Sequence, residues 1–155
     1  MARIPLPDAS ELAEELPELA AAMNLDRLNI GRALGNNPGA LVAANSYVGA
    51  LYDLLPATVR EVAILAVARE NDSEYEWHQH VRIARDEGVP LATIRAIGGE
   101  DHDSLDAVDR AVVEFVRAQC RAEVTDELFD ALAEQFSTAD VVAISRLAAN
   151  YTGTA

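Results

Sequence analysis

The segment between Pro56 and the pair Asn71–Asp72 constrains the fold of this chain more than any other. It reads TVREVAILAVARE, and apolar residues fill almost every position around a helix of this length. Proline is well tolerated at the start of a helix, and Asn followed by Asp is a typical helix break. Because a helix that is apolar nearly all round has to be covered on several sides, we expect residues 57–70 to be the buried centre of a helical fold.

Helix signals recur along the rest of the chain. Residues 73–87 form a second helical pattern that ends at Gly88, and the short break before it predicts an antiparallel hairpin with residues 57–70. Pro17 is predicted to interrupt a first helix, and no window shows the alternation of a strand. We therefore predict one all-α domain over residues 1–155, with about seven or eight helices. Candidate N-caps support further helix starts: Asp8, Ser10, Thr125 and Ser137.

The composition narrows the class of protein. Half of the 155 residues are hydrophobic, which is enough for a real core. No stretch approaches the roughly 20 apolar residues that span a bilayer, and the N-terminus does not resemble a signal peptide. We therefore expect a cytoplasmic protein with no membrane partner. The single cysteine, Cys120, excludes an internal disulfide and any C-x-x-C pair.

The charge is strongly acidic. There are 26 acidic residues against 12 basic ones, a net charge of -14, so nucleic acid is excluded as a partner because phosphate binding needs clustered basic residues. All 12 basic residues are arginines, and lysine is absent. This pattern is typical of proteins from salt-accumulating cells and indicates a haloarchaeal source. A GC-rich genome would also favour arginine over lysine.

The stretch NDSEYEWHQH contains two of the three histidines, the only tryptophan and two glutamates. On a helix, Glu76 and His80 share one stripe, and Trp77 lies on the neighbouring apolar stripe. His78 points about 200° away from His80. The two histidines therefore cannot bind one metal ion, and we predict no metal site.

Two interpretations of Glu76 and His80 remain open from the residues alone. Ser73 and Glu76 match a capping box, in which Glu76 would reach back to the Ser73 amide and leave His80 in solvent. Alternatively, Glu76 and His80 are an acid–base pair. Glu61 favours the second interpretation, because a charge inside the apolar segment 57–70 is costly unless it is paired or lines a cavity.

These residues belong to a longer stretch that resembles a known family. The segments LNIGRALGNNPGAL, REVAILAVARENDSEYEWHQHVRIARDEGV and LDAVDRAVVEFV resemble the carboxymuconolactone decarboxylase family, part of the alkylhydroperoxidase D-like superfamily. The similarity runs from about residue 27 to about residue 117. It implies an all-α, alkylhydroperoxidase D-like fold and a homo-oligomer, a trimer or hexamer, with the motif near subunit interfaces.

In the redox branch of this family the motif is a glutamate, eleven residues, and then C-x-x-C-x-x-x-H. Its glutamate falls on Glu61, its two cysteines on Ser73 and Glu76, and its histidine on His80. A thiol peroxidase needs a thiolate and a resolving thiol, which serine and glutamate do not supply. Cys120 lies outside the motif, where a small buried hydrophobe is the simpler interpretation. The resemblance therefore disfavours peroxidase activity.

The decarboxylase branch is similar to this chain in the EYEWxxH segment itself. It implies a cofactor-free lyase or isomerase for a small organic acid, in which His80 donates or accepts the proton, Glu76 shuttles it and Glu61 supports the relay. A substrate carboxylate would pair with Arg60, Arg69 or Arg82, among which the sequence does not choose. The implied substrate-binding residues are Tyr75, Trp77, Ser73 and Asn37.

One departure weakens the match to a true lactone decarboxylase. Relatives often carry a histidine in the turn where this chain has GNNPG, so Asn36 or Asn37 can bind a ligand there but cannot replace an acid–base group. Asn-Pro is also simply a favourable turn pair. Two alternatives to the lyase are an antioxidant relative that has lost its C-x-x-C and a non-catalytic, small-molecule-binding oligomer.

Overall fold

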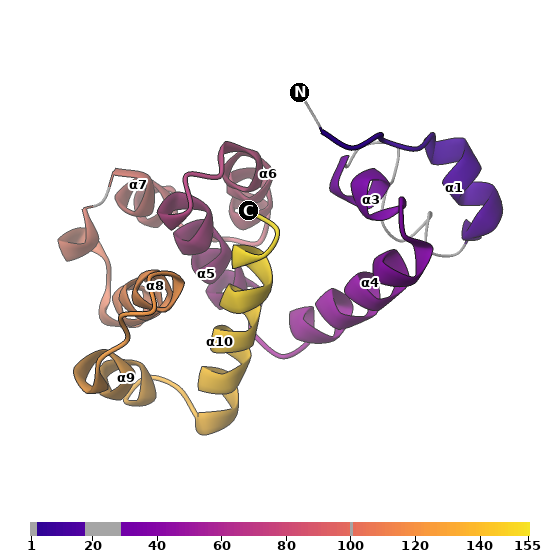
Figure 1. Ribbon diagram of the computed structural model, residues 1–155. Coiled ribbons are helices and arrows are strands. Elements are labelled where there is room, and N and C mark those ends of the chain that lie inside the picture. The colour runs from indigo at the N-terminus through magenta and orange to yellow at the C-terminus, as the bar shows by residue number, and fades with distance from the viewer. Residues whose placement is uncertain (1–2, 18–28, 100) are drawn as a thin grey trace. The chain divides into compact units, whose positions relative to one another are not determined.

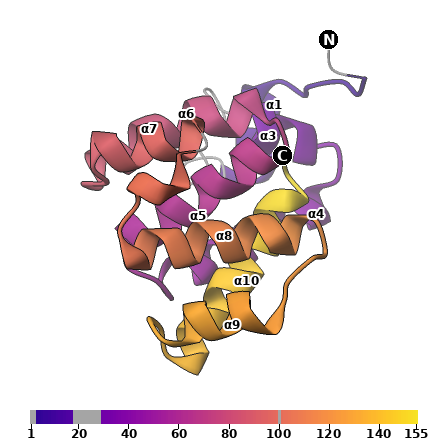
Figure 2. The same ribbon diagram turned by 90° about the vertical axis from the view of Figure 1, so that its left-hand side faces the viewer.

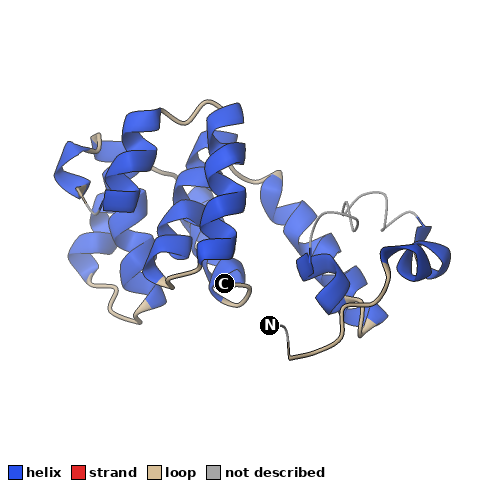
Figure 3. Cartoon of the chain, turned by 90° about the horizontal axis from the view of Figure 1, so that it is seen from above, coloured by secondary structure: helices blue, strands red, loops and turns tan. Residues whose placement is uncertain are grey.

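The computed structural model describes residues 3–17, 29–99 and 101–155, and these ranges contain helices and no strand (Figures 1 and 3). The all-α prediction is confirmed. The described ranges hold nine α-helices and one 3-10 helix, more than predicted, because some helices are too short to show a clear apolar period. They are α1 (Ala9–Glu15), α3 (Asn29–Leu34), α4 (Pro38–Tyr52), α5 (Ala57–Glu70), α6 (Glu74–Asp86), α7 (Leu91–Gly99), η1 (His102–Ser104), α8 (Ala107–Cys120), α9 (Asp126–Ala133) and α10 (Thr138–Thr152).

The chain forms two compact units, Met1–Ala50 and Leu51–Ala155. In the first unit, the Arg32 guanidinium of α3 donates to the carbonyl oxygens of Pro7 and Leu6, at 2.8 and 3.0 Å. A Cβ atom at Gly35 would lie 2.6 Å from Leu12 Cδ1, so only glycine lets Leu12 pack this closely. The N-terminal segment is therefore held against α3 by both polar and apolar contacts.

In the second unit α5 is the central helix, as its composition predicts. It contacts α6, α7, α8 and α10 (Figures 1 and 2), and residues 60–68 are all buried. Burial of one such aliphatic side chain stabilises a fold by about 1.5–3 kcal/mol. Helix α8 also packs against α10, and α9 packs on α8 and α10.

The α5–α6 hairpin is confirmed. Helix α5 begins after Pro56 and ends at Glu70, and Asp72 takes a left-handed conformation with φ of 50°. The Ser73 hydroxyl then caps α6 by accepting from the Glu76 amide at 3.4 Å. Gly88, with φ of 94°, follows the C-cap of α6 in a conformation that favours glycine. The side chains of Thr125 and Ser137 cap α9 and α10 as predicted.

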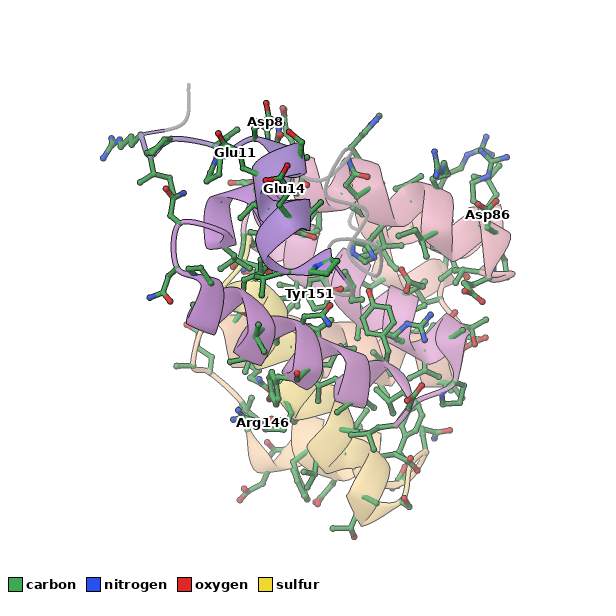
Figure 4. All side chains as sticks on the ribbon, turned by 90° about the vertical axis from the view of Figure 1, so that its right-hand side faces the viewer. Asp8, Glu11, Glu14, Asp86, Arg146 and Tyr151 are labelled. Carbon is green, nitrogen blue, oxygen red and sulfur yellow. The ribbon has the colours of Figure 1, made fainter. Side chains whose placement is uncertain are left out.

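Some of the acidic residues that give the chain its negative charge lie on exposed helix surfaces. Figure 4 labels Asp8, Glu11 and Glu14 along α1, and all three are exposed. Of the helices in the described ranges, none is long and apolar enough to cross a membrane.

Candidate functional site

The α5–α6 hairpin brings Glu61 and His80 together in the interior of the second unit. Glu61 lies in the second turn of α5 and is fully buried. His80 lies on the buried face of α6, where it is 5% exposed, whereas His78 is exposed. The turn after Glu70 reverses the chain, so that two residues nineteen positions apart become neighbours.

His80 lies between two carboxylates. Its Nδ1 atom is 2.7 Å from Glu61 Oε2, and its Nε2 atom is 3.5 Å from Glu76 Oε2. Because a carboxylate accepts hydrogen bonds, we assign the Nδ1 proton to the bond with Glu61, which leaves Nε2 as the nitrogen that faces Glu76. The three side chains are at most 8% exposed. The imidazole therefore contacts a carboxylate through each of its nitrogens in an environment that contains little water.

Glu76 does not complete a capping box. The Ser73 hydroxyl accepts from the Glu76 amide, but the Glu76 carboxylate lies against His80. Burial raises the pKa of Glu76 above its ordinary value, and the neighbouring His80 opposes this shift only in part. Glu76 therefore keeps its proton to a higher pH than an ordinary glutamate does.

Three further residues join this site, and two of them were not predicted from the sequence. Arg60 Nε donates to Glu61 Oε1 at 3.0 Å, and the Arg60 guanidinium carbon lies 4.3 Å from the centre of the Tyr52 ring. The hydroxyls of Tyr52 and Tyr151 are 2.6 Å apart, and the Tyr151 ring meets the His80 ring edge to face at 5.2 Å. We call these five residues the five-residue network, because each contacts two others and the contacts form a closed set.

Burial raises the pKa of both tyrosines in this network. The first cause is desolvation in each case, and the carboxylates of Glu61 and Glu76 add to it. Both hydroxyls therefore stay protonated in the pH range where proteins are folded. No local spacing could have revealed this pair, since Tyr52 and Tyr151 lie 99 positions apart.

The four predicted substrate-binding residues lie elsewhere. Ser73 and Trp77 line a pocket of about 760 Å³ on another side of α6. Tyr75 is 38% exposed. Asn37 belongs to the first unit, where its Oδ1 atom accepts from the Ala40 amide at 3.1 Å and so caps α4. The pocket has these lining residues: Ala68, Arg69, Asp72, Ser73, Glu74, Trp77, His78 and Gly98.

Cys120 lies at the end of α8, outside this site. Cys120 Sγ lies 3.4 Å from the Thr152 hydroxyl, and burial raises the pKa of this thiol, which makes it a poor nucleophile. Among the described residues, no group of three or more His, Cys, Asp and Glu side chains has the arrangement of a metal site.

The raised pKa of Glu76 gives a first prediction, on stability. The ordinary pKa of a glutamate is 4.5, and that of Glu76 is raised in the folded protein. Below pH 4.5 the carboxyl group is protonated in both the folded and the unfolded chain. As the pH rises through the raised value, ionisation costs more in the folded chain than in the unfolded one, and the unfolding free energy falls. Glu76→Gln, which is neutral at every pH, should therefore exceed the wild type in unfolding free energy near neutrality, by about 1 kcal/mol or roughly 2–4 °C. The difference should vanish in acid.

Thermal unfolding of both proteins across this pH range measures the effect. Glu74→Gln, on the exposed start of α6, is the matched control and should follow the wild type. A stability gain for Glu76→Gln that is the same in acid and near neutrality would contradict the assigned cause.

Comparisons with known proteins agree with the predicted family. The family model described as "Carboxymuconolactone decarboxylase family" matches residues 38–118. None of the curated proteins matches the sequence. Among solved structures, a crystal structure of the debrominase Bmp8 in complex with 2,3,4-tribromopyrrole is similar, with a TM-score of 0.82 and 20% sequence identity over 99% of this chain and 86% of that chain.

At this identity the structural likeness shows the fold alone, and it confirms the alkylhydroperoxidase D-like architecture predicted from the sequence. The family model covers residues 38–118, just over half of the 155 residues, and includes Glu61, Glu76 and His80. The chain belongs to the carboxymuconolactone decarboxylase family.

Proposed function

We propose that this protein is a cofactor-independent acid–base lyase or isomerase that acts on a small organic acid. The observation that carries the proposal is the buried contact of His80 with two carboxylates, at 2.7 and 3.5 Å. Burial of an isolated charge is costly, so a fold that buries two glutamates and a histidine together has to pair them. Acid–base catalysis is the chemistry that this combination supports best.

The roles follow from the position of each group. Glu61 is held by Arg60 and orients His80 through Nδ1. His80 Nε2 exchanges a proton with the substrate carbon next to a carbonyl group. Glu76 gives a proton to His80, or takes one from it, to complete the transfer. A proton transfer of this kind contributes about 10²–10⁴-fold to a rate.

Arg60 is the arginine that we assign to the substrate carboxylate. Of the three candidates it alone is buried in the site, whereas Arg69 lines the separate pocket and Arg82 is exposed. Its Nη2 atom is 3.7 Å from Glu87 Oε1, a loose contact with a side chain that is 45% exposed. A substrate carboxylate that replaced Glu87 here would form a closer pair with the guanidinium.

The comparisons support a small-molecule substrate. The debrominase with the same fold is in complex with 2,3,4-tribromopyrrole, a small ring compound. Thiol chemistry is the weaker alternative for this chain, because Ser73 and Glu76 stand at the two cysteine positions of the redox branch and Cys120 pairs with Thr152 instead.

The proposal is tested by incubating the protein with a panel of small β-keto acids and unsaturated lactone acids. We expect at least one acid to lose carbon dioxide or to shift a double bond, as measured by carbon dioxide release and by NMR of the products. Turnover should persist after thiol blocking and after chelation. Loss of turnover on thiol blocking, or no acid consumed above the rate of His80→Gln, would reject the proposed reaction.

A further inference from the structure

The hydroxyl pair of Tyr52 and Tyr151 is the part of the five-residue network that the proton relay does not use. Tyr52 is the last residue of α4 and Tyr151 lies near the end of α10, where Figure 4 labels it. The two oxygens are 2.6 Å apart. One hydrogen bond between two hydroxyls uses one of their two protons, so the pair still has one O–H to donate.

The tyrosine pair contacts His80 directly and Glu61 through Arg60. The Tyr151 ring contacts His80, and Arg60 joins the Tyr52 ring to Glu61. Arg60 Nη1 also donates to the Tyr52 carbonyl oxygen at 3.3 Å, which fixes the end of α4 over the guanidinium. Tyr52 is half-buried, so it is the most accessible member of the network.

The pair also has the electrostatic properties of a fixed donor. Both side chains are buried enough that their pKa values are raised, so neither ionises under ordinary conditions. A neutral O–H that is already oriented in a low-dielectric site stabilises a developing negative charge far more than water does, because it needs no reorganisation during the reaction.

We propose that the Tyr52–Tyr151 pair is the oxyanion-binding element of this site and that the substrate is a small acid with a carbonyl group β to its carboxylate. This inference rests on the proposed acid–base function. As carbon dioxide leaves, the bond between the carboxylate and the α-carbon breaks, and its electron pair moves to the carbonyl oxygen to give an enolate. The tyrosine O–H donates to that oxygen. The Glu76 carboxyl group gives its proton to His80 Nε2, which passes a proton to the α-carbon, and water then returns a proton to Glu76.

The test uses 4-nitrophenol, which as a phenolate mimics the enolate oxygen and changes its absorbance on binding. We expect Tyr52→Phe and Tyr151→Phe each to weaken phenolate binding by roughly 10–100-fold, the loss for a hydrogen bond to a charged group. Tyr47→Phe is the matched control, because it removes a hydroxyl from an exposed tyrosine of the same helix, α4. It should bind the phenolate as the wild type does.

The outcomes separate this inference from the proposed reaction. If the phenolate binds through the two hydroxyls but no acid is consumed, the oxyanion site stands and the reaction assigned to it fails. If acids are consumed and both Phe variants keep the wild-type phenolate affinity and kcat, the inference is overturned. If the Phe variants have a lower Tm but an unchanged phenolate affinity, the tyrosines have a structural role alone and the inference is overturned. It is also overturned if the wild type does not bind the phenolate. If Tyr151→Phe does not fold, the half-buried Tyr52 decides the question.

Discussion

Replacing His80 with glutamine is expected to lower the turnover of the acid identified in the substrate panel by about 10²–10⁴-fold. Glutamine has nearly the same length and can donate to Glu61, so the chain should still fold. It cannot take up a proton on one side and release it on the other, which is the role proposed for the imidazole between Glu61 and Glu76. The measurement is kcat, with the fold checked by circular dichroism.

His78→Gln is the matched control for this substitution. It changes the same residue type on the same helix, but His78 is exposed and lies on another side of α6. We expect its kcat to stay within about 2-fold of the wild type, since surface changes of this kind have small effects. Equal losses for His78→Gln and His80→Gln would mean that the Glu61–His80 contact is not the catalytic one.

Replacing Glu61 with alanine is expected to cost about 3–5 kcal/mol of unfolding free energy. The carboxylate is fully buried and accepts from both Arg60 Nε and His80 Nδ1. Its removal leaves a buried guanidinium and a buried imidazole without their acceptor and opens a cavity in the central helix. Urea denaturation measures the loss as a lower midpoint at an unchanged slope.

Glu61→Gln should cost less than Glu61→Ala, because it fills the same volume and keeps one acceptor oxygen. Glu74→Ala, at an exposed position of α6, should change the unfolding free energy by no more than about 0.5 kcal/mol. A Glu61→Ala protein as stable as Glu74→Ala would show that the buried contacts of Glu61 do not stabilise the fold.

Local signals in the sequence were enough to predict the helix hairpin. Pro56, Asn71, Asp72 and Gly88 each act within a few residues of the helix ends they define, through missing amide protons, capping and left-handed backbone. The all-α class followed from the same kind of local evidence. Helix α3, with six residues, is too short to show an apolar period, and it was not predicted.

The site was only partly predictable. Glu76 and His80 were singled out by their helical spacing, Glu61 by its charge inside an apolar helix, and all three by a family motif; the structure brings them together. Tyr52 and Tyr151 were missed because their contact joins the end of α4 to α10, and no spacing along the chain encodes such a pair. Ser73 and Trp77 were placed in the site by the resemblance of the EYEWxxH segment to the decarboxylase branch. On a helix that turns 100° per residue, sequence neighbours face different sides, and these two line another pocket.

The closed contacts of the five-residue network have a consequence for how this site evolves. Each of the five side chains contacts two others. Replacing one residue therefore leaves two neighbours with an incomplete set of contacts. A second replacement at one of those neighbours then costs less unfolding free energy than the same replacement in the wild type. The first substitution in such a set is therefore the most costly, and later substitutions are less so. Lineages that abandon the chemistry should therefore discard all five residues together, whereas lineages that retain it should hold all five nearly fixed.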